Sequence, residues 1–72
     1  MNEQTTLGDA LPAECARVRK LITQYRDPIL GVAGEIAAHM MEMSLQAADK
    51  AMVSGDLSAM ILAYEDLKGY SD

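Results

Sequence analysis

The feature that most constrains the fold is the segment 33–53, which contains no proline and, after Gly34, no glycine. Its apolar residues follow helical spacing in two adjacent series. The first series is Val32, Ile36, Met40, Met43, Ala47 and Ala51, and the second is Ala37, Met41, Leu45, Ala48 and Met52. A helix that is apolar over so much of its circumference needs two neighbours. The segment therefore predicts a central helix, packed against other helices of the chain or against a second copy.

A row of acids accompanies this helix at intervals of seven residues: Glu35, Glu42, Asp49 and Asp56. Seven residues make nearly two helical turns, so these carboxylates line one side of the helix beside the first apolar series. The pattern predicts a helix that presents negative charge outward while its apolar sides bind other surfaces.

Two further helices are predicted, at about 12–25 and 57–68. Pro12 suits the first position of a helix, and Asp27-Pro28 ends that helix because the residue before a proline avoids helical geometry. The turn 54–56 contains Gly55 for the end of the central helix and Asp56 as the cap of the next one. Such a short turn predicts an antiparallel hairpin of helices. The segment 28–34 is either a buried connection or the first turn of the central helix.

These elements predict an all-α, antiparallel three-helix arrangement. Residues 1–10 are expected to form a flexible polar tail, and residues 11–72 a single helical domain. The chain has 72 residues, no Trp and no Phe, and below roughly 70–80 residues one core rarely supplies more than about 3–5 kcal/mol. We therefore expect a homodimer. Its predicted apolar contact, for the second copy or another partner, is Met41, Leu45, Ala48 and Met52.

The net charge of −5 argues against nucleic acid as a direct ligand, because an acidic protein repels phosphate backbones. Cys15 is the only cysteine, which fits a reducing compartment. The N-terminus lacks the basic start and apolar run of a signal peptide, and no window approaches the roughly 18 consecutive apolar residues of a membrane span. The expected location is the cytoplasm, with no membrane contact.

No residue set predicts catalysis, a metal site or a cofactor. His39 lies between Glu35 and Glu42, but the di-metal helix motif places Glu three residues before His, and surface pairing of Glu35 with His39 is the simpler interpretation. Cys15 lies on the apolar side of the first helix without an assignable base. We therefore expect that the protein is not an enzyme.

Two groups of residues leave alternatives open. Positive charges at Arg17, Arg19, Lys20 and Arg26 either stay in solvent or pair with acids of the central helix. The adjacent methionines Met40, Met41 and Met43 point in different directions. They are either gap-fillers of a loosely specified core or part of an adaptable binding surface.

The stretches 11–19 (LPAECARVR) and 52–68 (MVSGDLSAMILAYEDLK) resemble small uncharacterised helical proteins of proteobacterial phage and prophage regions. The resemblance spans residues 11–68 and implies an accessory gene of a mobile element. In size and charge such proteins are similar to phage inhibitors of host machinery, anti-CRISPR proteins included.

The first functional hypothesis is accordingly a protein–protein interaction module that inhibits a host protein with a basic surface. It would act by steric or nucleic-acid-mimicking occlusion, through an acidic face of Glu35, Glu42, Asp49, Glu65 and Asp66. The alternative is a non-inhibitory structural or regulatory homo-oligomer whose basic first helix makes the outward contact. The sequence leaves open the partner, the oligomer order, and which of these two surfaces makes the contact.

Overall fold

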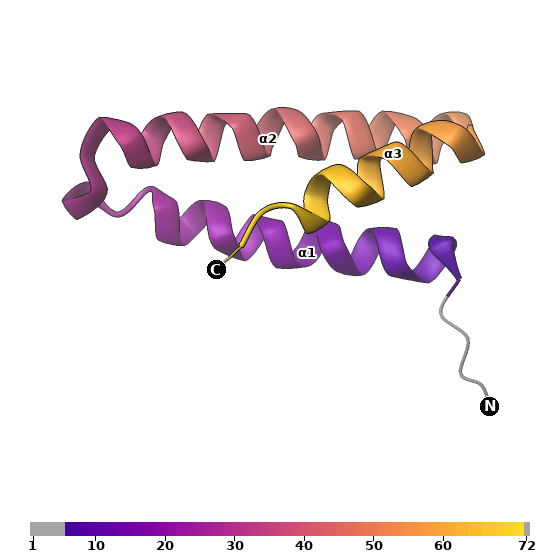
Figure 1. The fold of residues 1–72 in the computed structure, drawn as a ribbon, viewed down its shortest axis with the longest axis horizontal. Helices are drawn as coiled ribbons and strands as arrows, with labels where there is room; N and C mark the ends of the chain where they lie inside the picture. Colours follow the sequence, from indigo (N-terminus) through magenta and orange to yellow (C-terminus); the bar gives the residue numbers. More distant parts are fainter. Residues whose placement is uncertain (1–5, 72) are drawn as a thin grey trace.

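The computed structural model describes residues 6–71, and within this range the chain forms three α-helices. They are α1 (Leu7–Tyr25), α2 (Gly31–Ser54) and α3 (Leu57–Lys68), and a short 3₁₀ turn, η1 (Pro28–Leu30), precedes α2. Figure 1 shows α1 and α2 side by side and antiparallel, with α3 running back obliquely across them. Each helix packs against the other two. The predicted all-α, three-helix arrangement with a central second helix is confirmed.

The first helix begins earlier than the sequence predicts, at Leu7 rather than near Pro12. The backbone N–H of Asp9 donates to Thr6 Oγ1 at 3.3 Å, which caps the first turn, and the Asp9 carboxylate adds a favourable charge there. Leu11 is fully buried, so the apolar side of the helix extends upstream of Cys15. Residues 7–10 therefore belong to the helix and not to a tail. Residues 1–5 of the predicted tail lie outside the described range.

The connection between α1 and α2 is a compact corner built around two glycines. The backbone N–H of Ile29 donates to Asp27 Oδ1 at 3.0 Å, which starts η1. Gly31 follows with a φ of 62°, a conformation that other residues rarely adopt. At Gly34, an added Cβ would lie 2.2 Å from the Tyr25 carbonyl oxygen, so α2 passes α1 at a distance that only glycine permits. The segment 28–34 is thus a short 3₁₀ turn followed by the first turn of α2.

The turn between α2 and α3 forms as predicted. Gly55 ends α2 in the left-handed conformation, and its N–H donates to the Ala51 carbonyl at 3.0 Å. The side chain of Asp56 accepts from the N–H of Ala59 at 3.2 Å and so caps α3. This turn returns α3 across one side of α2.

The core lies between the three helices and is built from aliphatic and small side chains. Its buried residues are Leu11, Cys15, Val18, Leu21, Ile22, Ala38, Met41, Leu45, Ala48, Ala63 and Leu67. Tyr25, Tyr64 and Tyr70 are only partly buried at its border. The largest buried side chains are thus aliphatic, as the shortage of aromatic residues predicts.

The prediction that Met41, Leu45 and Ala48 form an apolar contact for a partner is wrong. These three residues are buried in the core of their own chain. Met52, the fourth residue of that predicted contact, is partly buried against the same core. The reason is that α1 and α3 both pack on the same side of α2, so the second apolar series is covered without any second copy.

Candidate protein-binding surface

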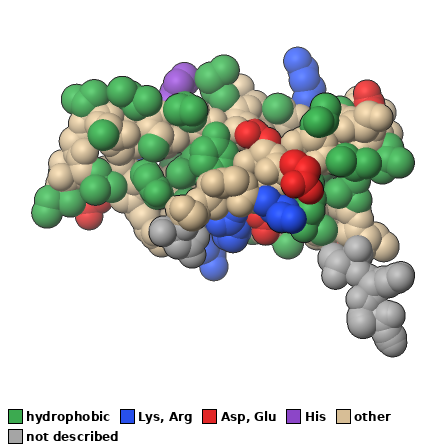
Figure 2. Space-filling view, in the orientation of Figure 1, with side chains coloured by type: hydrophobic (Ala, Val, Ile, Leu, Met, Phe, Trp, Pro, Cys, Tyr) green, Lys and Arg blue, Asp and Glu red, His purple; other side chains and the backbone are tan. Residues whose placement is uncertain are grey.

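Large apolar residues remain exposed in two places: along the first series of α2 with η1, and at the end of α2 and on α3, where they are Val53, Leu57, Ile61 and Leu62. Ile29 is 88 % exposed, Val32 74 %, and Ile36, Met40 and Met43 each more than half. Together with the exposed Ala47 they follow spacings of three and four residues along one side of the helix. We call these six residues the α2 outer face. Figure 2 shows hydrophobic side chains along the α2 edge of the molecule, beginning at the η1 end.

The α2 outer face is exposed because α1 and α3 occupy only the opposite side of the helix. The core residues Ala38, Met41 and Leu45 point toward α1 and α3, while Ile36 and Met43 lie about half a helical turn away from them. The second series thus forms the core, and the first series forms a surface, except for Ala51, which is buried.

Shallow depressions adjoin the C-terminal part of this face. One, of about 560 Å³, is lined by Met43, Gln46, Ala47, Asp49, Lys50 and Val53. The second, of about 420 Å³, lies between α2 and α3 and is lined by Ala47, Lys50, Ala51, Ser54 and Ala59. Both are wide open to solvent, whereas small-molecule sites usually enclose most of their ligand. These two shallow depressions are therefore better suited to side chains of another protein than to a small ligand.

Three acids of the predicted row, Glu35, Glu42 and Asp49, lie on the α1 side of α2 and are paired with arginines of the same chain, whereas Asp56 caps α3. Arg26 Nη2 lies 2.7 Å from Glu42 Oε2, and Arg26 Nε lies 3.8 Å from Glu35 Oε1. Arg19 Nη2 lies 3.8 Å from Asp49 Oδ1. Arg19 and Arg26 therefore pair with acids of the central helix, which is one of the two alternatives left open by the sequence. The three carboxylates therefore face partly neutralised surroundings.

Glu65 and Asp66 lie apart from that row, on the exposed side of α3. Within residues 6–71 neither side chain forms an ion pair. The five acids of the predicted contact thus occupy two separate surfaces, three beside α1 and two on α3. They do not form one continuous acidic face.

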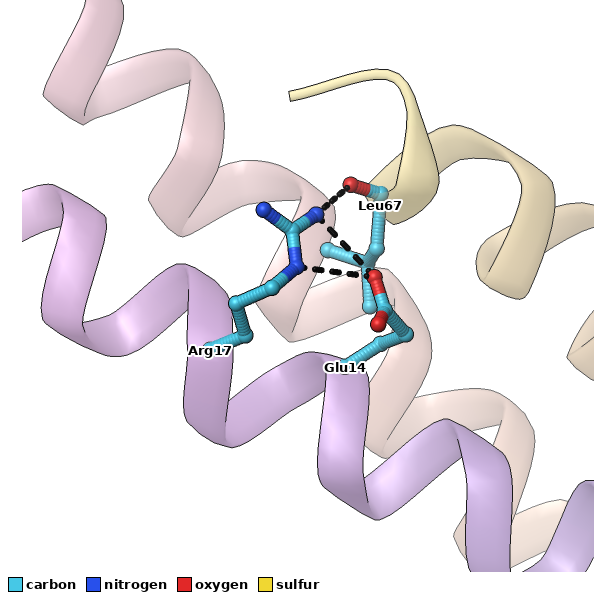
Figure 3. A network of polar contacts seen from close by, with 3 residues as sticks. All are labelled: Glu14, Arg17 and Leu67. Atoms are coloured by element: carbon cyan, nitrogen blue, oxygen red, sulfur yellow. Dashed lines mark hydrogen bonds and ion pairs between the residues drawn. The ribbon is translucent and has the colours of Figure 1, made fainter. Parts of the chain in front are cut away.

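Arg17 has a structural role that the sequence did not indicate. Its Nη2 donates to the carbonyl oxygen of Leu67 at 2.9 Å, and its Nε donates to Glu14 Oε1 at 3.1 Å (Figure 3). The guanidinium thereby satisfies a carbonyl at the last turn of α3 and fixes that turn on α1. The Glu14–Arg17 spacing is visible in the sequence, but the contact with Leu67 joins residues far apart in the chain.

A second long-range polar contact holds the C-terminal segment. The hydroxyl groups of Ser44 and Tyr70 lie 2.9 Å apart, and Ser44 is a buried polar residue of α2. Tyr25 Oη also donates to the carbonyl of Ser71 at 3.2 Å. Tyr70 thus provides Ser44 with a hydrogen-bond partner at the border of the core.

The residues weighed for chemistry lie in two places, Glu35, His39 and Glu42 on α2 and Cys15 on α1. Glu35 and Glu42 both lie near Arg26, and His39 is exposed between them on α2. In the described part of the chain no three potential metal ligands come together. Cys15 is 1 % exposed, and burial raises the pKa of its thiol above the ordinary 9.0, against the lowering effect of Arg19. Cys15 therefore acts as a packing residue.

Comparison with protein-family models, with curated proteins and with solved structures gives no match to this chain. Among residues 6–71, none of the helices combines the length and the apolar character needed to cross a bilayer. The description of function therefore rests on the surface itself.

Proposed function

We propose that this chain is a small protein–protein interaction module whose binding surface is the α2 outer face. The supporting observation is that five large apolar side chains, Ile29, Val32, Ile36, Met40 and Met43, are more than half exposed beside a core that is complete without them. Contiguous apolar surface of this kind is typical of sites that bind other proteins. One straight helix that presents anchors at spacings of three and four residues is a common mode of recognition.

The energetics favour a partner that brings apolar side chains of its own. Full burial of a Val, Ile or Met side chain contributes about 1.5–3 kcal/mol, so burying the exposed part of five contributes roughly 5–10 kcal/mol. Association costs about 4–15 kcal/mol in lost freedom. The α2 outer face alone barely offsets that cost. A purely charged partner surface would thus bind weakly.

More specifically, we propose a phage- or prophage-type accessory protein that binds a host protein and inhibits it by steric occlusion. Anti-CRISPR proteins are an example of this class of inhibitor. Glu65 and Asp66 support a basic rim on such a partner because both are exposed and, within residues 6–71, form no ion pair. Glu35, Glu42 and Asp49 give less support to nucleic-acid mimicry, since arginines of α1 already lie beside them. The apolar contact is therefore primary in this proposal, and the acids select the partner.

The test is capture of binding proteins from a host lysate by the immobilised chain and by matched variants. Ile36→Glu and Met43→Glu should abolish capture, whereas Leu57→Glu, at a similarly exposed residue on the first turn of α3, should not. The double variant Glu65→Lys/Asp66→Lys should weaken capture most at low salt, because exposed charges act through screened electrostatics. Capture that is indifferent to Ile36→Glu and Met43→Glu would show that the α2 outer face is not the binding surface.

A second candidate, a non-inhibitory structural or regulatory homo-oligomer, is favoured by one observation. The α2 outer face is uninterrupted by acids along its length, so the same face of another copy is a chemically suitable partner. In this case the immobilised chain captures only itself, and salt has little effect on the capture.

A further inference from the structure

We infer that the α2 outer face binds the α2 outer face of a second copy, with the two α2 helices antiparallel and Lys50 of each copy beside Glu35 of the other. This inference rests on the second candidate of the proposed function, the homo-oligomer, because it names a second copy as the occupant of the α2 outer face. It replaces the dimer contact predicted from Met41, Leu45 and Ala48, which are buried in the core.

The charge distribution allows two acidic copies to meet on this face. The protein has a net charge of −5, yet the six residues of the α2 outer face are all uncharged. The acids nearest to it, Glu35, Glu42 and Asp49, lie on the α1 side, where Arg19 and Arg26 offset their charge. Pairing through the α2 outer face therefore opposes apolar groups, and Glu42, the acid nearest the centre of the contact, is paired with Arg26 of its own copy at 2.7 Å.

The area of the face approaches what a stable dimer needs. A specific interface removes about 800 Å² per partner from solvent, which is about a sixth of the 4766 Å² surface of this chain. α2 has 24 residues and is therefore about 36 Å long, and it runs along the long edge of a molecule whose shortest dimension is 15 Å. That edge projects about 500 Å² before the relief of its side chains is counted, so contact along the whole of α2 approaches the required area.

Lys50 and Glu35 select the antiparallel orientation. They lie near opposite ends of α2, and the point midway between them is next to Met43, within the α2 outer face. An antiparallel copy centred there brings Lys50 opposite Glu35 at both ends of the contact. A parallel copy would instead place Lys50 opposite Lys50 and Glu35 opposite Glu35, and like charges repel.

The two charged groups are available for this contact. Glu35 is 62 % exposed and only 3.8 Å from Arg26, a weaker pairing than the 2.7 Å contact of Arg26 with Glu42. In the described range Lys50 forms no ion pair. In the same register Val32, which is 74 % exposed, lies opposite Val53, which is 90 % exposed. The antiparallel register thus covers the two most exposed apolar residues of α2 together.

The experiment measures the mass of the full chain in solution by sedimentation equilibrium across a range of concentrations. The expected mass is twice the 7.8 kDa of one copy. Ile36→Glu and Met43→Glu should give the single-copy mass with an unchanged helical circular dichroism spectrum, and Leu57→Glu, which lies outside the α2 outer face, should remain dimeric. A dimer that survives both Ile36→Glu and Met43→Glu overturns the inference.

Charge reversal tests the orientation. Lys50→Glu alone and Glu35→Lys alone should each raise the dissociation constant severalfold, and the double variant Lys50→Glu/Glu35→Lys should restore it. Failure of the double variant to restore binding overturns the antiparallel arrangement.

A photo-reactive amino acid at Met43 separates this inference from the proposed function. A cross-link to Met43 or its neighbours in a second copy supports the inference. A single-copy mass together with a cross-link to a different protein overturns the inference but leaves the α2 outer face as a binding surface. A single-copy mass with no cross-link to any protein contradicts both.

Discussion

At the scale of single residues, the closest approach in the fold is made at Gly34, where α2 passes the end of α1. An added Cβ would lie 2.2 Å from Tyr25 O and 2.7 Å from Leu30 Cβ, so both neighbours would have to move. The position therefore depends on the absence of a side chain. The helical propensity of alanine cannot compensate for the clash, because the nearest atom belongs to the backbone.

The first prediction is that Gly34→Ala destabilises the protein. Overpacking costs about 1–3 kcal/mol, and the better helix propensity of Ala returns about 1 kcal/mol, so we expect a net loss of up to about 2 kcal/mol. The measurement is urea unfolding followed by circular dichroism. Gly8→Ala is the matched control, since its added Cβ would meet Thr6 Oγ1 at an ordinary 3.7 Å. Equal stability of the two variants would show that α2 can move away from α1 without cost.

The second prediction concerns Cys15, whose thiol is held neutral by burial. Because the pKa is raised in the folded state, the unfolded chain loses the thiol proton at a lower pH than the folded chain does. The stabilising contribution is therefore intact below the ordinary value of 9.0 and decreases as the pH rises past it. The difference in unfolding free energy between the native protein and Cys15→Ala should shrink above that pH. A difference that stays constant into the alkaline range would contradict the linkage.

The same burial predicts slow alkylation of Cys15. The thiolate is the reactive form, and the side chain is 1 % exposed in the fold. Iodoacetamide should modify the native protein slowly and the urea-unfolded protein rapidly, with mass spectrometry as the readout. Rapid modification of the native chain would mean that α1 opens readily.

The third prediction concerns Arg17 at the contact between α1 and α3. Arg17→Met keeps the aliphatic stem but removes the hydrogen bond to Leu67 and the pairing with Glu14. A hydrogen bond from a charged group contributes about 1.5–3 kcal/mol. The Arg17 side chain is 32 % exposed, so we expect the lower part of that range. Arg19→Met is the control, because an exposed pair such as Arg19–Asp49 contributes at most about 1 kcal/mol. Thermal unfolding should show the larger loss for Arg17→Met.

At the scale of the elements, the sequence predicts helices best where their ends carry local chemistry. The bounds 57–68 agree with α3 because Gly55 and Asp56 act within the turn itself. The start of α1 was missed because Pro12 suits a first position, although it lies inside the helix. The cap at Thr6 depends on one side chain contact with Asp9, and the segment 7–10 has too few apolar residues to show a period.

The candidate surface was harder to predict because both apolar series of α2 have the same helical spacing. Which of the two series is buried depends on the side of α2 against which α3 packs. That side is set by the tertiary structure and not by the local sequence. The sequence did contain a relevant feature: Gly34, Ala38 and Ala48 lie on the side that is buried, and small residues permit the close approach of helices. The outer series instead contains Ile36, Met40 and bulky neighbours. The acids of α2 were placed correctly on one side, but their pairing with Arg19 and Arg26 depended on how α1 is oriented.

At the scale of the whole molecule, the small core and the exposed α2 outer face both bear on the free energy of unfolding. A core in a chain of this size supplies about 3–5 kcal/mol, and the five large apolar residues of the α2 outer face stay in solvent when the chain is alone. A partner that binds the folded state but not the unfolded one adds to this stability by mass action. If the partner is a second copy, the addition must grow with protein concentration.

The fourth prediction is therefore that the melting temperature of the full chain rises with its own concentration. A tenfold increase in concentration should add about 1.4 kcal/mol to the unfolding free energy per dimer, because unfolding then includes dissociation. The shift is measured by circular dichroism at several concentrations. Ile36→Glu should melt at a temperature independent of concentration, since its charge on the α2 outer face opposes dimerisation, and Leu57→Glu should retain the dependence. If the unmodified chain melts at the same temperature at all concentrations, it folds as a monomer and the prediction is contradicted. The exposed apolar series would then be open to a different protein.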